Sequence, residues 1–300
     1  MSRWSFPLST RYFAISAVML VVASAGAGYA YWEGGHPHVT VLSIDDAPEG
    51  IVFIADAHLK PGNIENVQNV IQRINELNPS IVLVGGDFLF GEEEDLSSQE
   101  IWGGIKAPVY AVLGNHDYHS GIDATSAISK SLAVSRTDRD PGTYDMSSLF
   151  DETTNLSSAA ALEEVLEAHG VVVLRNEYVI LDLSGIPLLL VGVDDGWAGM
   201  ADPPAVPATD AFSIYMIHEP ECRADWDADL ILAGHTHGGQ FGGTALQFLN
   251  DAGIMKLSGY VRGSRTPVYI TRGLGTSNLP WDLRLGTAPE IVIINPASRV

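Results

Sequence analysis

The sequence predicts an α/β fold that follows an apolar amino-terminal helix. Short runs of apolar, often β-branched residues recur from residue 51 onward and are typical of buried strands. The first run is followed by an amphipathic helix pattern and then by a second run. This strand–helix–strand order predicts a largely parallel sheet with a right-handed crossover. The 300 residues are enough for one sizeable domain of this class.

The amino terminus predicts a membrane segment or an export signal. Residues 1–11 form an n-region with two arginines, and residues 12–32 carry no charge and are long enough to cross a bilayer as a helix. The basic flank predicts that the n-region is cytoplasmic and that everything downstream lies outside the cytoplasm. Two interpretations stay open. The aromatic flank that ends at Trp32 favours a retained transmembrane signal anchor, whereas the small residues 24–30 suit cleavage of a signal peptide.

The elements of the exported part follow in order. Residues 33–50 are predicted as a linker that contains a short edge strand, and residues 51–296 as the main domain. Apolar positions recur at helical spacing from Ile64 to Leu77, and Asn78-Pro79 ends that helix. A second helix is predicted at 159–168, and the strands are predicted at 51–55, 81–84, 109–113, 171–174, 178–183, 188–193, 213–217, 230–233 and 268–271.

Residues 121–158 stand out as an insertion. They are rich in Ser, Thr and Asp and lack a sustained period. A segment of this length without regular structure is usually a functional lid or a solvated loop. We therefore expect either a cap over a functional crevice or a plain surface loop.

The charge balance and the cysteine content limit the possible partners. The 37 acidic and 16 basic residues give a formal net charge of −21. Nucleic acid would be repelled by such a surface, so we expect no nucleic-acid partner. Cys222 is the only cysteine, which excludes an internal disulfide. We expect Cys222 to be a small buried apolar residue.

Several predicted strands end in residues that bind metals or transfer protons. The carboxyl ends of parallel strands meet at one rim, where α/β sheets bind what they act on. A mixture of oxygen ligands and imidazoles suits a pair of divalent metals. The residues at these strand ends are Asp56, His58, Asp87, Asn115, His116, Asp117, His218, His235 and His237.

Such a site would suit phosphoester hydrolysis. The reaction needs an activated water, charge neutralisation on the phosphate oxygens and a proton for the leaving group, and two metals about 3.5–4 Å apart supply the first two. A carboxylate must bridge the metals. Asp87 is the natural bridge, because Gly85-Gly86 before it removes side chains that would keep the metals from the backbone. Neutral ligands such as Asn115 keep the site positive enough to attract a phosphate.

Together these motifs resemble the calcineurin-like metallophosphoesterase superfamily. Asp56-Ala57-His58, Gly86-Asp87, Gly114-Asn115-His116-Asp117, His218 and Gly234-His235-Thr236-His237 occur in the order and approximate spacing of that superfamily. Gly238-Gly239-Gln240 and Arg272-Gly273-Leu274-Gly275 look like its membrane-associated phosphodiesterase branch, related to YkuE and YaeI. The resemblance covers roughly residues 50–295. It implies a four-layer α/β/β/α sandwich.

The resemblance also implies a role for each site residue. Asp56, His58 and His237 would hold one metal and Asn115, His218 and His235 the other, with Asp87 between them. His116 would stay unligated and donate a proton to the leaving oxygen or steady the transition state. Asp117 would fix the tautomer of that imidazole and raise its basicity. The cofactors would be two divalent metal ions, Mn, Zn or Fe.

We therefore expect a binuclear metal-dependent phosphodiesterase that uses a metal-activated water at a membrane face, with a phosphoester substrate that could be lipid-linked. The resemblance includes hydrolysis of the UDP-2,3-diacylglucosamine pyrophosphate bond, which is the alternative activity. A non-catalytic metal-binding module is a second alternative, and the complete ligand set and His116 speak against it. The expected location is a single-pass membrane protein with its domain outside the cytoplasm, or a secreted or periplasmic protein if the signal is cleaved.

Overall fold

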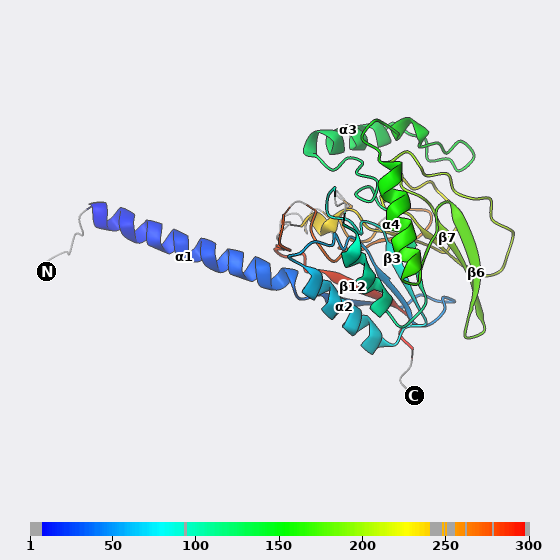
Figure 1. Ribbon diagram of the computed structural model, residues 1–300, viewed down its shortest axis with the longest axis horizontal. Helices are drawn as coiled ribbons and strands as arrows, with labels where there is room; N and C mark the ends of the chain where they lie inside the picture. Colours follow the sequence, from blue (N-terminus) through cyan, green and yellow to red (C-terminus); the bar gives the residue numbers. More distant parts are fainter. Residues whose placement is uncertain are drawn as a thin grey trace.

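The chain folds into two mixed six-stranded sheets that face one another, with a long helix extending from the domain (Figure 1). The computed structural model describes residues 8–92, 95–240, 248, 250, 256–261, 263–277 and 279–297. The first seven residues of the predicted n-region lie outside these described residues. The α/β class expected from the sequence is confirmed.

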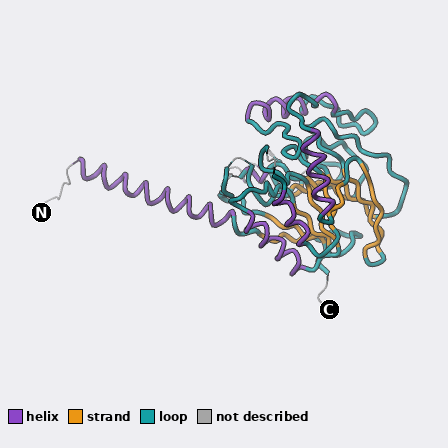
Figure 2. Tube along the Cα trace, viewed as in Figure 1, coloured by secondary structure: helices purple, strands orange, loops and turns teal. Residues whose placement is uncertain are grey.

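The extending helix is α1 (Leu8–Gly34), and it contains the predicted apolar segment 12–32. Its part from Ile15 to Gly34 is long and apolar enough to cross a membrane. Nearly all of its side chains are exposed, because the helix projects away from the domain (Figures 1 and 2). Among the described side chains of this helix, only those of the last turn are buried, where Ala30 and Glu33 meet the domain.

The first sheet is built around parallel strands, as predicted. Its spatial order is β1 (His38–Leu42), β12 (Glu290–Ile294), β2 (Ile51–Ile54), β3 (Ile81–Gly85), β4 (Val109–Val112) and β5 (Val171–Val173). The strands from β2 to β5 are all parallel. The strand β12 was not predicted, and it lies between β1 and β2, antiparallel to β2. The outer face of the first sheet packs against α2 (Ile64–Leu77), α4 (Leu156–Ala168) and the 3-10 helix η1 (Ser97–Gly104).

The second sheet has a parallel centre and antiparallel edges. Its order is β10 (Gly259–Tyr260), β11 (Val268–Ile270), β9 (Leu230–Ala233), β8 (Phe212–Met216), β7 (Ile186–Gly192) and β6 (Glu177–Leu183). Phe53 and Leu83 of the first sheet pack against Leu190, Ile214 and Leu232 of the second, all fully buried. Each such side chain contributes about 1.5–3 kcal/mol by leaving water. This shared core holds the strand ends of both sheets in fixed positions.

The insertion at 121–158 contains regular structure that its composition did not indicate. Its helix α3 (Ala124–Val134) is followed by a single 3-10 turn, η2 (Ser147–Leu149). The helix begins at the N-cap Asp123, whose carboxyl accepts the N–H groups of Thr125 and Ser126 at 2.9 and 3.1 Å. Val134 and Leu149 pack on the outer face of the second sheet. The insertion therefore contributes to the layer that covers this sheet.

Candidate metal centre

The predicted site residues come together at one crevice, but they come from two sheets instead of one shared rim. Strands β2, β3 and β4 of the first sheet lead into the loops of Asp56, Asp87 and Asn115. Strands β8 and β9 of the second sheet lead into the loops of His218 and His235. The crevice is a cavity of about 340 Å³.

The chain leaves these strands through turns with unusual dihedral angles. Asp56, His58, Asp87, His235 and His237 all have φ between 42° and 71°. This left-handed region costs a non-glycine residue about 1–3 kcal/mol, and such strain is concentrated at functional sites. Backbone hydrogen bonds maintain it: the N–H of His58, for example, donates to the carbonyl of Asp87 at 3.0 Å.

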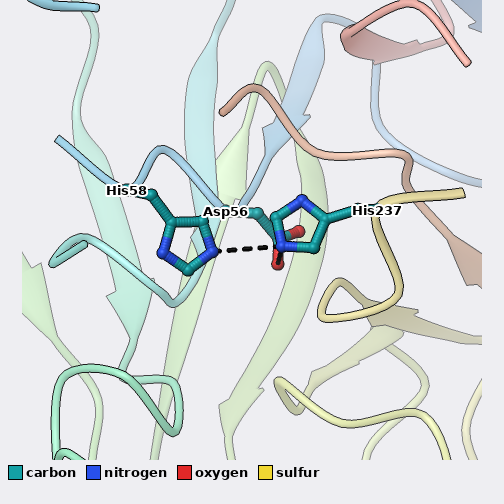
Figure 3. Close-up of side chains that lie close together, drawn as sticks. All are labelled: Asp56, His58 and His237. Carbon is teal, nitrogen blue, oxygen red and sulfur yellow. Dashed lines mark hydrogen bonds and ion pairs between the residues drawn. The ribbon is translucent and has the colours of Figure 1, made fainter. Parts of the chain in front are cut away.

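The first group of candidate metal ligands consists of Asp56, His58 and His237 (Figure 3). The Nε2 atoms of the two imidazoles lie 3.1 Å apart, and His237 Nε2 lies 3.8 Å from Asp56 Oδ1. His58 Nδ1 lies 2.8 Å from the carbonyl oxygen of Leu89. His237 Nδ1 lies 3.2 Å from that of Gly275. With the proton assigned to Nδ1 in both rings, both Nε2 lone pairs point at one place.

The second group consists of Asn115, His218 and His235. His235 Nδ1 lies 3.1 Å from Asn115 Oδ1. The Nδ2 of Asn115 donates to the carbonyl of Ser120 at 2.6 Å, so its Oδ1 faces the imidazole. His218 Nδ1 lies 2.7 Å from the carbonyl oxygen of Gly85, which leaves Nε2 as the ligand atom.

Asp87 lies between the two groups. One carboxylate oxygen, Oδ2, is 3.3 Å from Nε2 of His58 and 3.1 Å from Nε2 of His218. The other oxygen, Oδ1, accepts the backbone N–H of His116 at 2.9 Å. A single carboxylate therefore contacts an imidazole of each group, which is the position that a shared ligand needs.

Burial prepares the imidazoles to act as ligands. It lowers the pKa of His58 and of His237 well below the usual value, and it lowers the pKa of His235 to about 4. These rings are therefore neutral near pH 7 and can offer a lone pair. Burial also opposes protonation of His218, but the carboxylates of Asp87, Asp56 and Glu219 together raise the pKa of this ring well above its usual value.

The carboxyl of Asp56 is the clearest sign that the residues fit a cation. Burial raises its pKa to about 7. Its Oδ2 is buried and has no hydrogen-bond partner among the described residues. A Cβ at Gly234 or at Gly273 would approach this oxygen within 2.7 or 2.6 Å, so both glycines leave the oxygen the room it occupies. A buried carboxylate oxygen beside converging lone pairs suits a divalent metal.

The expected contact between Asp117 and the imidazole of His116 is wrong. The carboxyl of Asp117 instead accepts backbone N–H groups at 2.8–3.0 Å, from Asp87, Phe88, Leu89 and Gly114. His116 Nδ1 lies 3.0 Å from the carbonyl oxygen of Phe90. The two side chains therefore have separate tasks: Asp117 holds the loop of Asp87, and a backbone carbonyl orients His116.

Two further residues at the cavity were missed from the sequence. The ring of Trp197 packs edge-on against His235, with centroids 4.5 Å apart. Trp197 follows β7 by a few residues, so the strand-end signal that indicated the ligands could have found it. Gln240 lines the cavity with φ 47° and ψ −53°, and its buried Nε2 has no partner within the described part of the chain. Nothing local in the sequence indicated that conformation.

Comparison with known proteins agrees with these motifs. Residues 50–239 match the family model described as calcineurin-like phosphoesterase. The chain is 25% identical over 305 residues to phosphodiesterase YaeI of Escherichia coli, covering 96% of this chain and 98% of the relative. It is 25% identical over 313 residues to a zebrafish transmembrane protein with metallophosphoesterase domain, covering 94% and 62%. It is 28% identical over 286 residues to the UDP-2,3-diacylglucosamine pyrophosphatase LpxG of Chlamydia trachomatis, covering 81% and 82%.

Proposed function

Because the chain belongs to the calcineurin-like phosphoesterase family, we propose that it is a binuclear metal-dependent phosphodiesterase that works at a membrane face. Membership of the family makes phosphoester hydrolysis the general activity. The observation that carries the finer proposal is the position of Asp87. One of its carboxylate oxygens lies within 3.3 Å of an imidazole from each ligand group.

The proposed ligands divide into two sets around that carboxylate. Asp56, His58 and His237 would hold one ion, Asn115, His218 and His235 the other, and Asp87 both. Two divalent ions would supply the Lewis acidity that activates water and neutralises the phosphoryl oxygens. Carboxylate, amide and imidazole ligands together are compatible with Mn, Zn or Fe.

His116 is the proposed general acid. It lines the cavity, and one of its ring nitrogens lies within 4.8 Å of the ligand atoms of His58 and Asp87. Nδ1 donates to the carbonyl of Phe90, so the proton for the leaving oxygen is the one that the doubly protonated ring carries on Nε2, and its transfer leaves the ring neutral. The same contact fixes the ring plane, so the proton is presented from one direction.

The cavity wall supports a substrate with an organic group on each side of the phosphate. Ile122, Ala124 and Ala127 of the insertion and Trp197 line the cavity beside the ligands. This apolar side suits a substituent that a diester retains during hydrolysis. The Nε2 of Gln240, which has no partner among the described residues, is a donor suited to a phosphate oxygen. The similarity to a relative named phosphodiesterase supports the same choice.

A location in the membrane is part of the proposal. The apolar helix α1 is long enough to span a bilayer, and one similar protein is named as transmembrane. With a basic n-region on the cytoplasmic side, the domain would lie outside the cytoplasm. A phosphoester held at the membrane face, including a lipid-linked one, would then be within reach.

The similarity to LpxG favours a second candidate, a pyrophosphohydrolase for UDP-2,3-diacylglucosamine-type substrates. This candidate uses the same ligands and differs only in the bond that is cut. A domain facing the cytoplasm would favour it, since nucleotide sugars are made there. Release of a nucleoside monophosphate from such a substrate, without cleavage of simple diesters, would establish it in place of the phosphodiesterase.

The test is hydrolysis of bis-p-nitrophenyl phosphate by the full-length protein in detergent, with added Mn²⁺ or Zn²⁺. We expect metal-dependent release of nitrophenol from the diester, and a slower reaction with the monoester. Metal-loaded protein that is inert towards diesters, monoesters and pyrophosphates alike would contradict the proposed activity. Elemental analysis of the same sample tests whether two ions are bound per chain.

A further inference from the structure

The last turn of α1 is built into the domain. Ala30 and Glu33 are only 6% and 8% exposed, although most of the helix is exposed. The carbonyl of Ala30 accepts the backbone N–H of Arg284 at 3.0 Å. Glu33 Oε2 accepts the backbone N–H of Gly286 at 2.6 Å. The helix end therefore holds the segment 282–286, which we call the docking loop.

Gly34 sets how closely the helix end approaches the docking loop. A Cβ at this position would lie 2.1 Å from the carbonyl oxygen of Asp282. That separation is far below any van der Waals contact, and the obstacle is backbone, which cannot rotate away as a side chain can. Gly34 does not have a positive φ, so its conformation alone does not require glycine. The need for glycine here arises from the contact.

On its other side the docking loop reaches the metal centre through Arg284. The side chain is fully buried, and its guanidinium donates to the carbonyls of Arg272 at 2.6 Å and His237 at 3.3 Å. It also donates to the carbonyl of Gly275, the same oxygen that faces Nδ1 of His237. Arg284 thus holds both the backbone of a proposed ligand and the acceptor that orients its ring.

We propose that the end of α1 is needed to complete the metal centre, and that Glu33 and Arg284 are positioning residues for His237. The inference rests on the proposed metal-dependent function. Docking of the helix fixes the docking loop, the docking loop fixes Arg284, and Arg284 fixes the ring of His237, whose Nε2 would bind the first ion. A cut among residues 24–30 would remove most of the helix that presents Glu33 and Gly34 to the docking loop, so the retained helix is the form with a complete centre.

The test compares two glycines of the same helix in the full-length protein. Gly34→Ala introduces the collision with Asp282, whereas Gly28 has no atom within 4 Å of the added Cβ and provides the matched control. The measurement is Mn²⁺ or Zn²⁺ affinity by calorimetric titration in detergent. We expect Gly34→Ala to weaken affinity by about 10-fold or more, the scale of disrupted ligand orientation. Gly28→Ala should bind as the unaltered protein does.

A second pair decides the matter if Gly34→Ala does not fold. Glu33→Gln keeps an oxygen that accepts the N–H of Gly286, whereas Glu33→Ala removes the acceptor. We expect weaker metal binding for Glu33→Ala and recovery in Glu33→Gln. The inference about the helix end would be overturned if Glu33→Ala, and Gly34→Ala where it folds, bound metal as tightly as the unaltered protein. That result would leave the proposed function standing. An unaltered protein that binds no metal would overturn the proposed function as well.

Discussion

The two groups of proposed metal ligands are supported by different parts of the chain. In the first group, His237 is held by Arg284, which belongs to the loop under the end of α1. In the second, His235 packs on Trp197, whose carbonyl accepts the Lys130 ammonium of the insertion at 2.8 Å. The side chain of His235 is 17% exposed and that of His237 is 8% exposed, so the crevice is more open over the second group.

The difference separates two tasks. The strand ends of the sheets place the proposed ligand atoms, and they do so in the same way for both groups. The segments outside the sheets decide what each group faces. The docking loop connects the first group to the apolar helix α1, and the insertion forms a cavity wall beside the second group. Changes at the shared ligand should therefore damage both groups, and changes in a support should damage only its own.

Replacement of the shared ligand is expected to have the largest effect. Asp87→Asn keeps the shape but removes the charge that contacts both His58 and His218. We expect hydrolysis to fall by at least about 10⁴-fold, which corresponds to about 5 kcal/mol, with loss of bound metal. The measurements are diester hydrolysis and metal content. The control is Asp182→Asn, an exposed carboxyl near the end of β6. Two fully occupied metal sites in Asp87→Asn would contradict the shared role.

Replacement of His116 should separate chemistry from metal binding in both groups. His116→Ala is expected to reduce the rate by about 10²–10³-fold, within the usual range for a lost general acid. Metal content should stay unchanged, because the ring is proposed to hold no ion. His169→Ala, at the end of α4, is the control. A metal-loaded His116→Ala protein with full activity would refute the assigned role, and loss of metal would make His116 a ligand.

The convergence of the proposed ligands at one crevice could be predicted because the signals of these residues are local. Each follows an apolar run directly, and the order of the motifs is independent of how the strands are arranged. Their origin in two sheets could not be predicted, since it depends on the pairing of strands that are remote in sequence. The strand β12 illustrates this limit, because its register partner β1 lies about 250 residues away and no turn connects them.

The residues that support the two groups could not be predicted from the sequence for a related reason. Arg284 contacts His237 only because the docking loop packs between α1 and the ligand loop. The helix α3 was not predicted because it is short and rich in small polar residues, and its N-cap Asp123 is one of several acids in the insertion. The pairing of Asp117 with His116 was wrong because neighbours in sequence need not face one another after a turn. The backbone N–H groups beside Asp87 compete for that carboxyl.

Replacement of Asp117 should affect the stability of the protein more than it affects the protonation of His116. Asp117→Asn replaces one acceptor oxygen with a donor that faces backbone N–H groups, of which that of Asp87 is one. We expect a loss of about 3 kcal/mol in the free energy of unfolding, from donors left unpaired in a buried site. Thermal denaturation and the pH–rate profile are the measurements. An unchanged melting temperature with a shifted profile would restore the contact between Asp117 and the His116 ring.

The smallest effect is expected at the support of the second group. Lys130 is 4% exposed, donates to the carbonyls of Leu149 and Trp197, and pairs with Asp151 at 2.7 Å. Lys130→Met keeps the apolar stem and removes these contacts, so the cavity wall should loosen. We expect KM for the diester to rise about fivefold, or about 1 kcal/mol, with unchanged metal affinity. The exposed Lys106→Met is the control. Because the ligands of the second group are placed by β4, β8 and β9, a loss of metal affinity in Lys130→Met would show that the insertion supports the ligands themselves as well as the wall.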